Sequence, residues 1–155
     1  MKVLVLGYSM AGKSTAAEIA ASMLGCSNPV NTSDILIHDF CVSNNLPMDK
    51  VVNNKNLYRD ALFKFGVQKQ IIDPRYPVPE ALEKSDVVTG VRTPESLESV
   101  RHMFNLIIWI SRPSINRGPT DKLSSYDCDT TIINNGTMEE LKVKLSNVLS
   151  KYAHT

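Results

Sequence analysis

The chain has 155 residues, of which 43% are hydrophobic and 21% are charged, and its formal net charge is +1. This length suits one domain with a buried core, and the composition is ordinary for a soluble globular protein. The balanced charge gives no overall reason to expect a polyanionic partner, no apolar run is long enough to cross a membrane, and the N-terminus lacks the features of a signal peptide.

The first predicted element is a short apolar strand, Val3 to Leu6, followed by a glycine-containing loop. Gly7, Gly12, Lys13 and Ser14 complete the pattern G-x-x-x-x-G-K-[ST] between this strand and an apolar-periodic helix, which is the context of a phosphate-binding loop. Its glycines let backbone N–H groups and the helix N-terminus face an anion. The pattern predicts that the chain binds a nucleoside triphosphate.

Within this loop, Lys13 is expected to reach the β- and γ-phosphates and the Ser14 hydroxyl to bind Mg²⁺. ATP and Mg²⁺ are therefore the expected cofactors. The loop residues expected to bind the nucleotide are Gly7, Ser9, Ala11, Gly12, Lys13, Ser14 and Thr15.

The predicted helix from Lys13 ends at Gly25, and a short strand, 29–32, follows it. Ser33 is the expected N-cap of a helix over 34–42. The polar stretch 48–54 predicts at most one irregular helical turn.

A longer helix is predicted over 55–71. Its inward side chains are expected to be Leu57, Ala61, Leu62 and Phe65. A proline-rich loop over 73–79 and a short helical piece to about residue 84 follow.

The C-terminal half alternates strands with helices. Strands are predicted over 86–90, 106–110 and 130–133, and helix starts at Thr93-Pro94 and at Thr137. Strands alternating with helices predict an α/β fold, a three-layer sandwich in which a five-stranded parallel sheet carries helices on both faces.

The nucleotide should bind beyond the carboxyl ends of these strands. Two segments leave strand ends on that side: 34–80, the expected acceptor-binding insertion, and 111–129, a short lid. Both belong to one predicted domain, 1–155.

The compartment is predicted from the cysteines. Cys26, Cys41 and Cys128 are widely spaced, which favours reduced thiols over a disulfide framework or a zinc site. We therefore expect a cytoplasmic protein, in the host cytoplasm if it is viral, without a membrane partner. The oligomeric state is left open, a homodimer included.

Several stretches resemble the nucleotide-kinase branch of the P-loop NTPases, in particular phage deoxynucleoside monophosphate kinases and dephospho-CoA kinases. The resemblance covers most of the chain in a consistent order. Besides the phosphate-binding loop, the stretches that carry it are 33–36, 58–66, 87–95, 110–113 and 131–137.

The resemblance implies a nucleotide-type acceptor held between the second and third strands, and a lid after the fourth. It places Asp34 beside the acceptor hydroxyl, Arg92 with its partner Glu95 at the acceptor or its phosphate, and Asn134 with Gly136 near the adenine. The chain departs from the family pattern at Gly90, where such kinases often carry Asp, and at 65–68, where they tend to read Leu-Gly-Thr-Glu.

The residue types suggest further roles in phosphoryl transfer, which needs positioning and charge neutralisation more than covalent chemistry. Arg112 and Arg117 are expected to close over the phosphates from the lid. Asp34 is expected either to orient and deprotonate an acceptor hydroxyl or to hold Mg²⁺ through water. Its alternative is a carboxylate that favours the helix dipole.

Three residues are candidates for the acceptor pocket. The planar guanidinium of Arg59 suits an acceptor phosphate, and an ordinary surface role is the alternative. Arg75 and Tyr76 are placed to line the pocket, with Tyr76 either stacking on a base or simply packing.

The main functional hypothesis is a kinase that transfers the γ-phosphate of ATP to a nucleotide-type acceptor, most simply a deoxynucleoside monophosphate. An alternative acceptor is a 5-hydroxymethylpyrimidine such as 5-hydroxymethyluracil, in phage DNA or as a nucleotide; the balanced charge does not favour DNA. A further alternative is a non-catalytic nucleotide-binding switch. The chain has Asn134-Asn135-Gly136-Thr137 where a guanine-selective switch would carry Asn-Lys-x-Asp, which disfavours that hypothesis.

Overall fold

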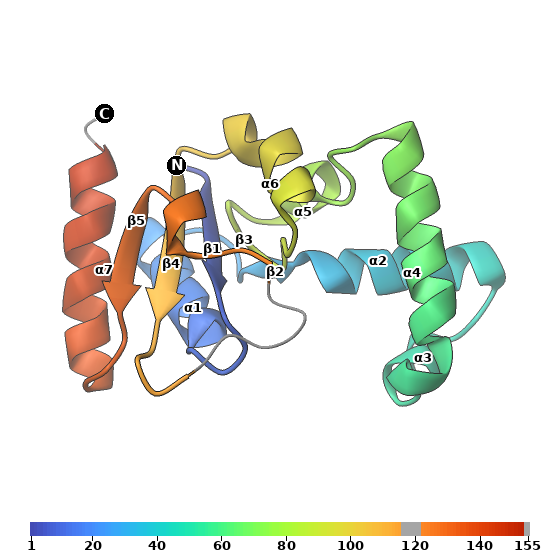
Figure 1. The fold of residues 1–155 in the computed structure, drawn as a ribbon, viewed down its shortest axis with the longest axis horizontal. Coiled ribbons are helices and arrows are strands. Elements are labelled where there is room, and N and C mark those ends of the chain that lie inside the picture. The colour runs from blue at the N-terminus through green and yellow to red at the C-terminus, as the bar shows by residue number, and fades with distance from the viewer. Residues whose placement is uncertain (116–121, 154–155) are drawn as a thin grey trace.

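The structure is a computed structural model that describes residues 1–115 and 122–153. Its strands form one parallel sheet in the order β2-β3-β1-β4-β5 (Figure 1). The strands are β1 (Val3–Gly7), β2 (Val30–Asn31), β3 (Val87–Thr89), β4 (Leu106–Ser111) and β5 (Thr130–Ile133). The predicted five-stranded parallel sheet is therefore confirmed.

The sheet is buried on both faces because its central strands are apolar at every position but the last. In β1, Val3 and Val5 face one core cluster, whereas Leu4 and Leu6 face another. The helices α1 (Lys13–Leu24) and α7 (Met138–Ala153) cover the first face, and α5 (Val78–Lys84) and α6 (Pro94–Val100) cover the second. The predicted three-layer arrangement is confirmed.

Three helices form an arm beside the sheet: α2 (Thr32–Asn44), α3 (Met48–Val52) and α4 (Lys55–Ile72). Figure 1 shows α2 leading away from β2, with α3 and α4 at the far end from α7. The arm has its own small core, built on Phe40, Cys41 and Val51. The fold is completed by two 3₁₀ turns, η1 (Arg101–Met103) and η2 (Ser125–Asp127).

Two local predictions in the arm are wrong. The N-cap of α2 is Asn31 rather than Ser33, because the Asn31 Oδ1 accepts a hydrogen bond from the Ser33 N–H at 2.9 Å. On α4, Leu57 and Ala61 are exposed rather than inward. No residue of α4 is buried, since the helix rests on the arm through half-buried side chains such as Leu62 and Phe65.

The predicted helix ends near the sheet are confirmed. Gly25 caps α1 in the left-handed conformation, with φ of 67°. The Thr93 hydroxyl accepts the Ser96 N–H at 3.2 Å, with Pro94 as the first helical residue of α6. Within the described ranges, no helix combines the length and apolar character needed to cross a lipid bilayer.

Candidate active site

The phosphate-binding loop joins β1 to α1 in a conformation that its glycines permit. Gly12 has a φ of 93°, and an added Cβ at Gly7 would lie 2.6 Å from the Ile110 carbonyl oxygen of the neighbouring strand. The Lys13 Nζ donates a hydrogen bond to the Gly7 carbonyl at 3.0 Å, so the lysine folds back across the loop. The loop is thus shaped to surround an anion.

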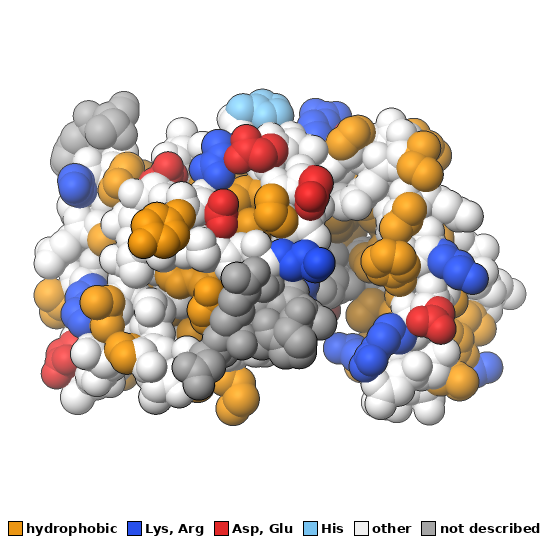
Figure 2. Space-filling view, viewed as in Figure 1, with side chains coloured by type: hydrophobic (Ala, Val, Ile, Leu, Met, Phe, Trp, Pro, Cys, Tyr) orange, Lys and Arg blue, Asp and Glu red, His pale blue; other side chains and the backbone are white. Residues whose placement is uncertain are grey.

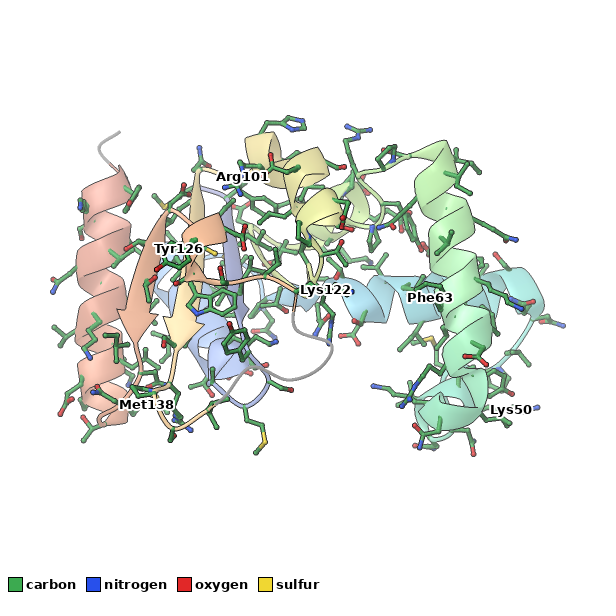
Figure 3. All side chains as sticks on the ribbon, viewed as in Figure 1. Lys50, Phe63, Arg101, Lys122, Tyr126 and Met138 are labelled. Atoms are coloured by element: carbon green, nitrogen blue, oxygen red, sulfur yellow. The ribbon has the colours of Figure 1, made fainter. Side chains whose placement is uncertain are left out.

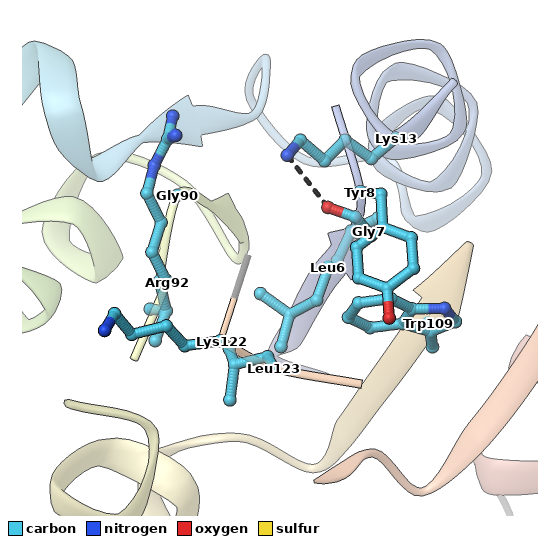
Figure 4. A pocket seen from close by; sticks show the side chains of 11 residues that line it. Leu6, Gly7, Tyr8, Lys13, Gly90, Arg92, Trp109, Lys122 and Leu123 are labelled. Atoms are coloured by element: carbon cyan, nitrogen blue, oxygen red, sulfur yellow. Dashed lines mark hydrogen bonds between the residues drawn. The ribbon is translucent and has the colours of Figure 1, made fainter. Parts of the chain in front are cut away.

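A cleft opens in front of this loop (Figure 4). Lys13, Arg92 and Lys122 line it together with Gly7 and Tyr8, and no carboxylate is among the described side chains that do so. Three cations around a glycine-containing loop would favour a negatively charged ligand in this cleft. We refer to it below as the phosphate cleft.

Lys122 is a residue that the sequence analysis did not select. Figure 4 shows its side chain in the cleft beside that of Arg92, and Figure 3 locates it in the whole molecule. The adjacent Leu123 is 5% exposed and packs into the core under β1 and β4, which holds Lys122 at the cleft. The only sequence signal was a basic residue in the predicted lid, next to an apolar one.

Trp109 forms the floor of the phosphate cleft. Its ring meets that of Tyr8 edge to face, with the centroids 4.9 Å apart, so the loop and β4 are in direct contact. Trp109 is the single tryptophan of the chain, and its fluorescence should report on ligands in the cleft.

Asn134 ties the end of β5 to the phosphate-binding loop. Its side chain is buried and donates from Nδ2 to the Ala11 carbonyl at 3.0 Å, while its backbone N–H donates to the Ser111 carbonyl. The Arg112 Nε donates to the Asn134 carbonyl at 3.3 Å, which places this lid residue near the same loop. Arg117 lies outside the described residues.

Ser14 and Asp34 line a shared hollow behind the phosphate-binding loop, together with Asn31 and Thr89. These side chains offer hydroxyl, carboxylate and amide oxygens, the ligand type that Mg²⁺ prefers. Among the described residues, no three His, Cys, Asp or Glu side chains could hold a metal ion on their own. The donor set therefore fits a Mg²⁺ ion that is shared with nucleotide phosphates. Thr89 was not among the site residues predicted from the sequence.

A second cavity of about 270 Å³ lies between α2, α4 and α6, and we call it the acceptor cavity. Most of its wall is apolar, from side chains such as Leu36, Leu62, Phe63 and Val67. Arg75, Tyr76 and Arg92, three of the candidate residues, line it.

Asp34, Arg59 and Glu95 do not line this cavity. Arg59 is exposed and donates to the Asn56 side chain at 2.8 Å, which is a surface environment. Glu95 is also exposed, and within the described ranges it forms no ion pair with Arg92.

Tyr76 is held in the wall of the acceptor cavity from several sides. It is 8% exposed, its hydroxyl donates to Asp39 Oδ2 at 2.8 Å, and its carbonyl accepts from Gln70 Nε2 at 3.0 Å. Burial raises the pKa of Tyr76, and its bond to Asp39 raises it further. Burial opposes ionisation of Asp39, but hydrogen bonds from Tyr76, Glu80 and His38 outweigh it and lower the Asp39 pKa.

Tyr76→Phe is expected to lower the free energy of unfolding by about 1–2 kcal/mol at pH 7, because the Asp39 carboxylate loses a hydrogen-bond donor. A lowered folded-state pKa stabilises the fold above the ordinary value of 3.8, and that stabilisation is lost as the pH falls through the folded value. Urea unfolding at pH 7 and pH 3.5 checks this. The difference in free energy of unfolding between wild type and variant should be smaller at pH 3.5 than at pH 7. A larger difference at pH 3.5 would contradict the stabilising role given to the Tyr76–Asp39 hydrogen bond.

Comparison with known proteins identifies the fold. No family model and no curated protein matches the chain. Among solved structures, it is similar to TT1252 from Thermus thermophilus (TM-score 0.56, 15% identity, 97% of each chain). It is also similar to the shikimate kinase from Aquifex aeolicus vf5 (TM-score 0.53, 14% identity, 99% of this chain and 98% of that one). The chain therefore shares the α/β fold of these two structures.

Proposed function

We propose that the protein is an ATP-dependent kinase that phosphorylates a nucleotide-type acceptor, most simply a deoxynucleoside monophosphate. The observation that carries this proposal is that the phosphate cleft and the acceptor cavity share a wall, Gly90 to Arg92. A triphosphate bound at the first site would thus end beside a molecule bound at the second. Such proximity is the main requirement of phosphoryl transfer.

Each basic residue of the phosphate cleft has a role under this proposal. Lys13 neutralises the β- and γ-phosphates, and Lys122, from the lid segment, adds positive charge to the cleft. Arg92 lines both cavities, so its guanidinium can bind the acceptor phosphate and the transferred group together. Ser14, with Asp34 and Thr89 behind the loop, would hold Mg²⁺, which offsets charge on the phosphate oxygens.

The acceptor cavity suits a flat, largely apolar group. Its apolar wall and the fixed Tyr76 ring would enclose a nucleobase, and Phe63, which is 70% exposed, stands at its edge. The position of Arg92 supports binding of the phosphate at the end nearest the phosphate-binding loop.

The proposal is tested by transfer of labelled phosphate from ATP to a panel of acceptors. The panel holds the four deoxynucleoside monophosphates, dephospho-CoA, 5-hydroxymethyluracil as nucleotide and in DNA, and shikimate, which the name of the similar Aquifex kinase suggests. We expect transfer to a deoxynucleoside monophosphate. Label that passes only to water or to shikimate would contradict the proposal.

Arg92→Met should lower kcat/KM for the acceptor about 100-fold, because a charged contact to the phosphate is lost, with ATP affinity changed much less. Steady-state kinetics with varied acceptor, and Trp109 fluorescence titration with ATP, measure the two effects. Arg59→Met is the matched control, since this exposed arginine lies outside the cavity. Equal losses in both variants would remove Arg92 from the acceptor site.

One observation favours a second candidate, a 5-hydroxymethylpyrimidine within DNA. Residues 48–72 of the arm carry five Lys or Arg against two Asp, although the whole chain is nearly neutral. Figure 2 shows basic and hydrophobic side chains together over α4, beside the acceptor cavity. A polyanion could lie there, and transfer to DNA that falls steeply with salt would favour this acceptor.

A further inference from the structure

The acceptor cavity has polar side chains whose hydrogen-bonding groups are already used by the protein. The Tyr76 hydroxyl donates to Asp39, and the Arg75 guanidinium donates twice to Asp73, at 3.0 Å each. The Thr93 hydroxyl caps α6. These groups shape the wall of the cavity, but their strongest hydrogen bonds are not available to a ligand.

Gln70 of α4 is different because only half of its amide is used. Its Nε2 donates to the Tyr76 carbonyl at 3.0 Å and to the Ser96 hydroxyl at 3.4 Å. A carbonyl oxygen can only accept, so the amide nitrogen must face Tyr76 and the orientation of the amide is determined. The Nε2 atom therefore bonds to protein atoms from two other segments.

The Oε1 of Gln70 remains as an acceptor. Gln70 is half-buried and lines the acceptor cavity, and within the described residues no donor bonds to its Oε1. No buried side-chain oxygen or nitrogen of the described residues lacks a partner, so this oxygen is accessible. An oriented, accessible acceptor in a mostly apolar wall discriminates between ligands, because a mismatched polar edge loses its hydrogen bond on entry.

We propose that Gln70 determines acceptor specificity through its Oε1, which selects a base that presents an N–H donor at this position. This inference rests on the proposed function, because it takes the acceptor to be a nucleotide. Because the orientation of the amide is fixed, its Oε1 favours a donor and disfavours an acceptor. A base edge that carries only acceptors would place one of them against the Oε1 without a hydrogen between them. Tyr76 and Ser96 act as positioning residues for the amide.

The test pairs each deoxynucleoside monophosphate with a counterpart whose base-edge N–H is replaced by N-methyl: N3-methyl-dTMP, N1-methyl-dGMP, N4,N4-dimethyl-dCMP and N6,N6-dimethyl-dAMP. For the acceptor that wild type phosphorylates best, methylation should lower kcat/KM about 10- to 100-fold. Gln70→Met, which keeps the length of the side chain but lacks the amide, should lower kcat/KM for the unmodified acceptor about tenfold. In this variant the penalty for methylation should shrink to less than about threefold.

Gln68→Met is the matched control, because it makes the same substitution at an exposed position of α4 outside the cavity. It should retain the full penalty for methylation. An equal penalty in wild type and Gln70→Met would mean that the methyl group is excluded by shape, and would overturn the role of Gln70. Absence of transfer to every deoxynucleoside monophosphate would instead refute the proposed function and, with it, this inference.

Discussion

Replacement of Lys13 by alanine should lower kcat for phosphate transfer on the order of 10³-fold. Lys13 lies at the start of α1, and its Nζ crosses the phosphate-binding loop to the Gly7 carbonyl. It lines the phosphate cleft together with Arg92 and Lys122. Its removal would take away one of the three cations that line this cleft in the described part of the chain. Single-turnover transfer of labelled phosphate measures the effect.

The fold should survive this change, because Lys13 is only partly buried and belongs to neither face of the sheet core. Circular dichroism melting should therefore show a change in Tm of no more than a few degrees. Lys142→Ala is a suitable control, since Lys142 forms an exposed pair with Glu139 on α7. Near-normal turnover in Lys13→Ala would refute the assignment of the phosphate-binding loop.

Gly90→Ala should destabilise the fold by about 2–4 kcal/mol, which corresponds to a loss of about 5–15 °C in Tm for a chain of this size. Gly90 has a φ of 104°, which side chains rarely adopt. An added Cβ would lie 2.4 Å from the Thr32 Oγ1 and 2.5 Å from the Asn31 Oδ1. The Asn31 oxygen cannot move away freely, because it caps α2.

Gly25→Ala serves to separate the two causes of this destabilisation, the backbone strain from a positive φ and the steric clash of the added Cβ. Gly25 also has a positive φ, 67°, but an added Cβ would meet nothing within 4 Å. Its replacement should cost about 1 kcal/mol from backbone strain alone. Urea unfolding of both variants measures the difference, which represents the steric clash. Equal losses would show that residue 90 has room for a side chain.

The same contact explains the departure from the kinase pattern at residue 90. The chain has glycine at this position, where the resembling kinases often carry Asp, and the structure gives a physical reason. The backbone of Gly90 passes against the beginning of α2, where no Cβ fits. Thr89, one residue earlier, is the polar side chain that shares a hollow with Ser14.

The candidate site could be predicted only in part. Arg75 and Tyr76, which the sequence suggested as acceptor-pocket residues, both line the acceptor cavity, and their role there stays a prediction. Arg59 was a candidate because its guanidinium suits a phosphate, with a surface role as the alternative. The helix α4 rests on a small separate core, and this arginine is exposed. Gln70 could not be selected from the sequence, because the orientation of its amide depends on Tyr76 and Ser96, which lie in other segments.

The sequence by itself determined the sheet and the phosphate-binding loop. Both are encoded by short stretches of sequence. Apolar runs that pack on two faces encode the strands, and two glycines with Lys13 and Ser14 within eight consecutive residues encode the loop. Only the tertiary structure decided what stands opposite that loop. Arg92, Lys122 and Asn134 reach it from segments more than 70 residues away along the chain. Their positions follow from the order of the strands and the packing beneath them. Such long-range juxtapositions depend on the whole core, so no short pattern encodes them.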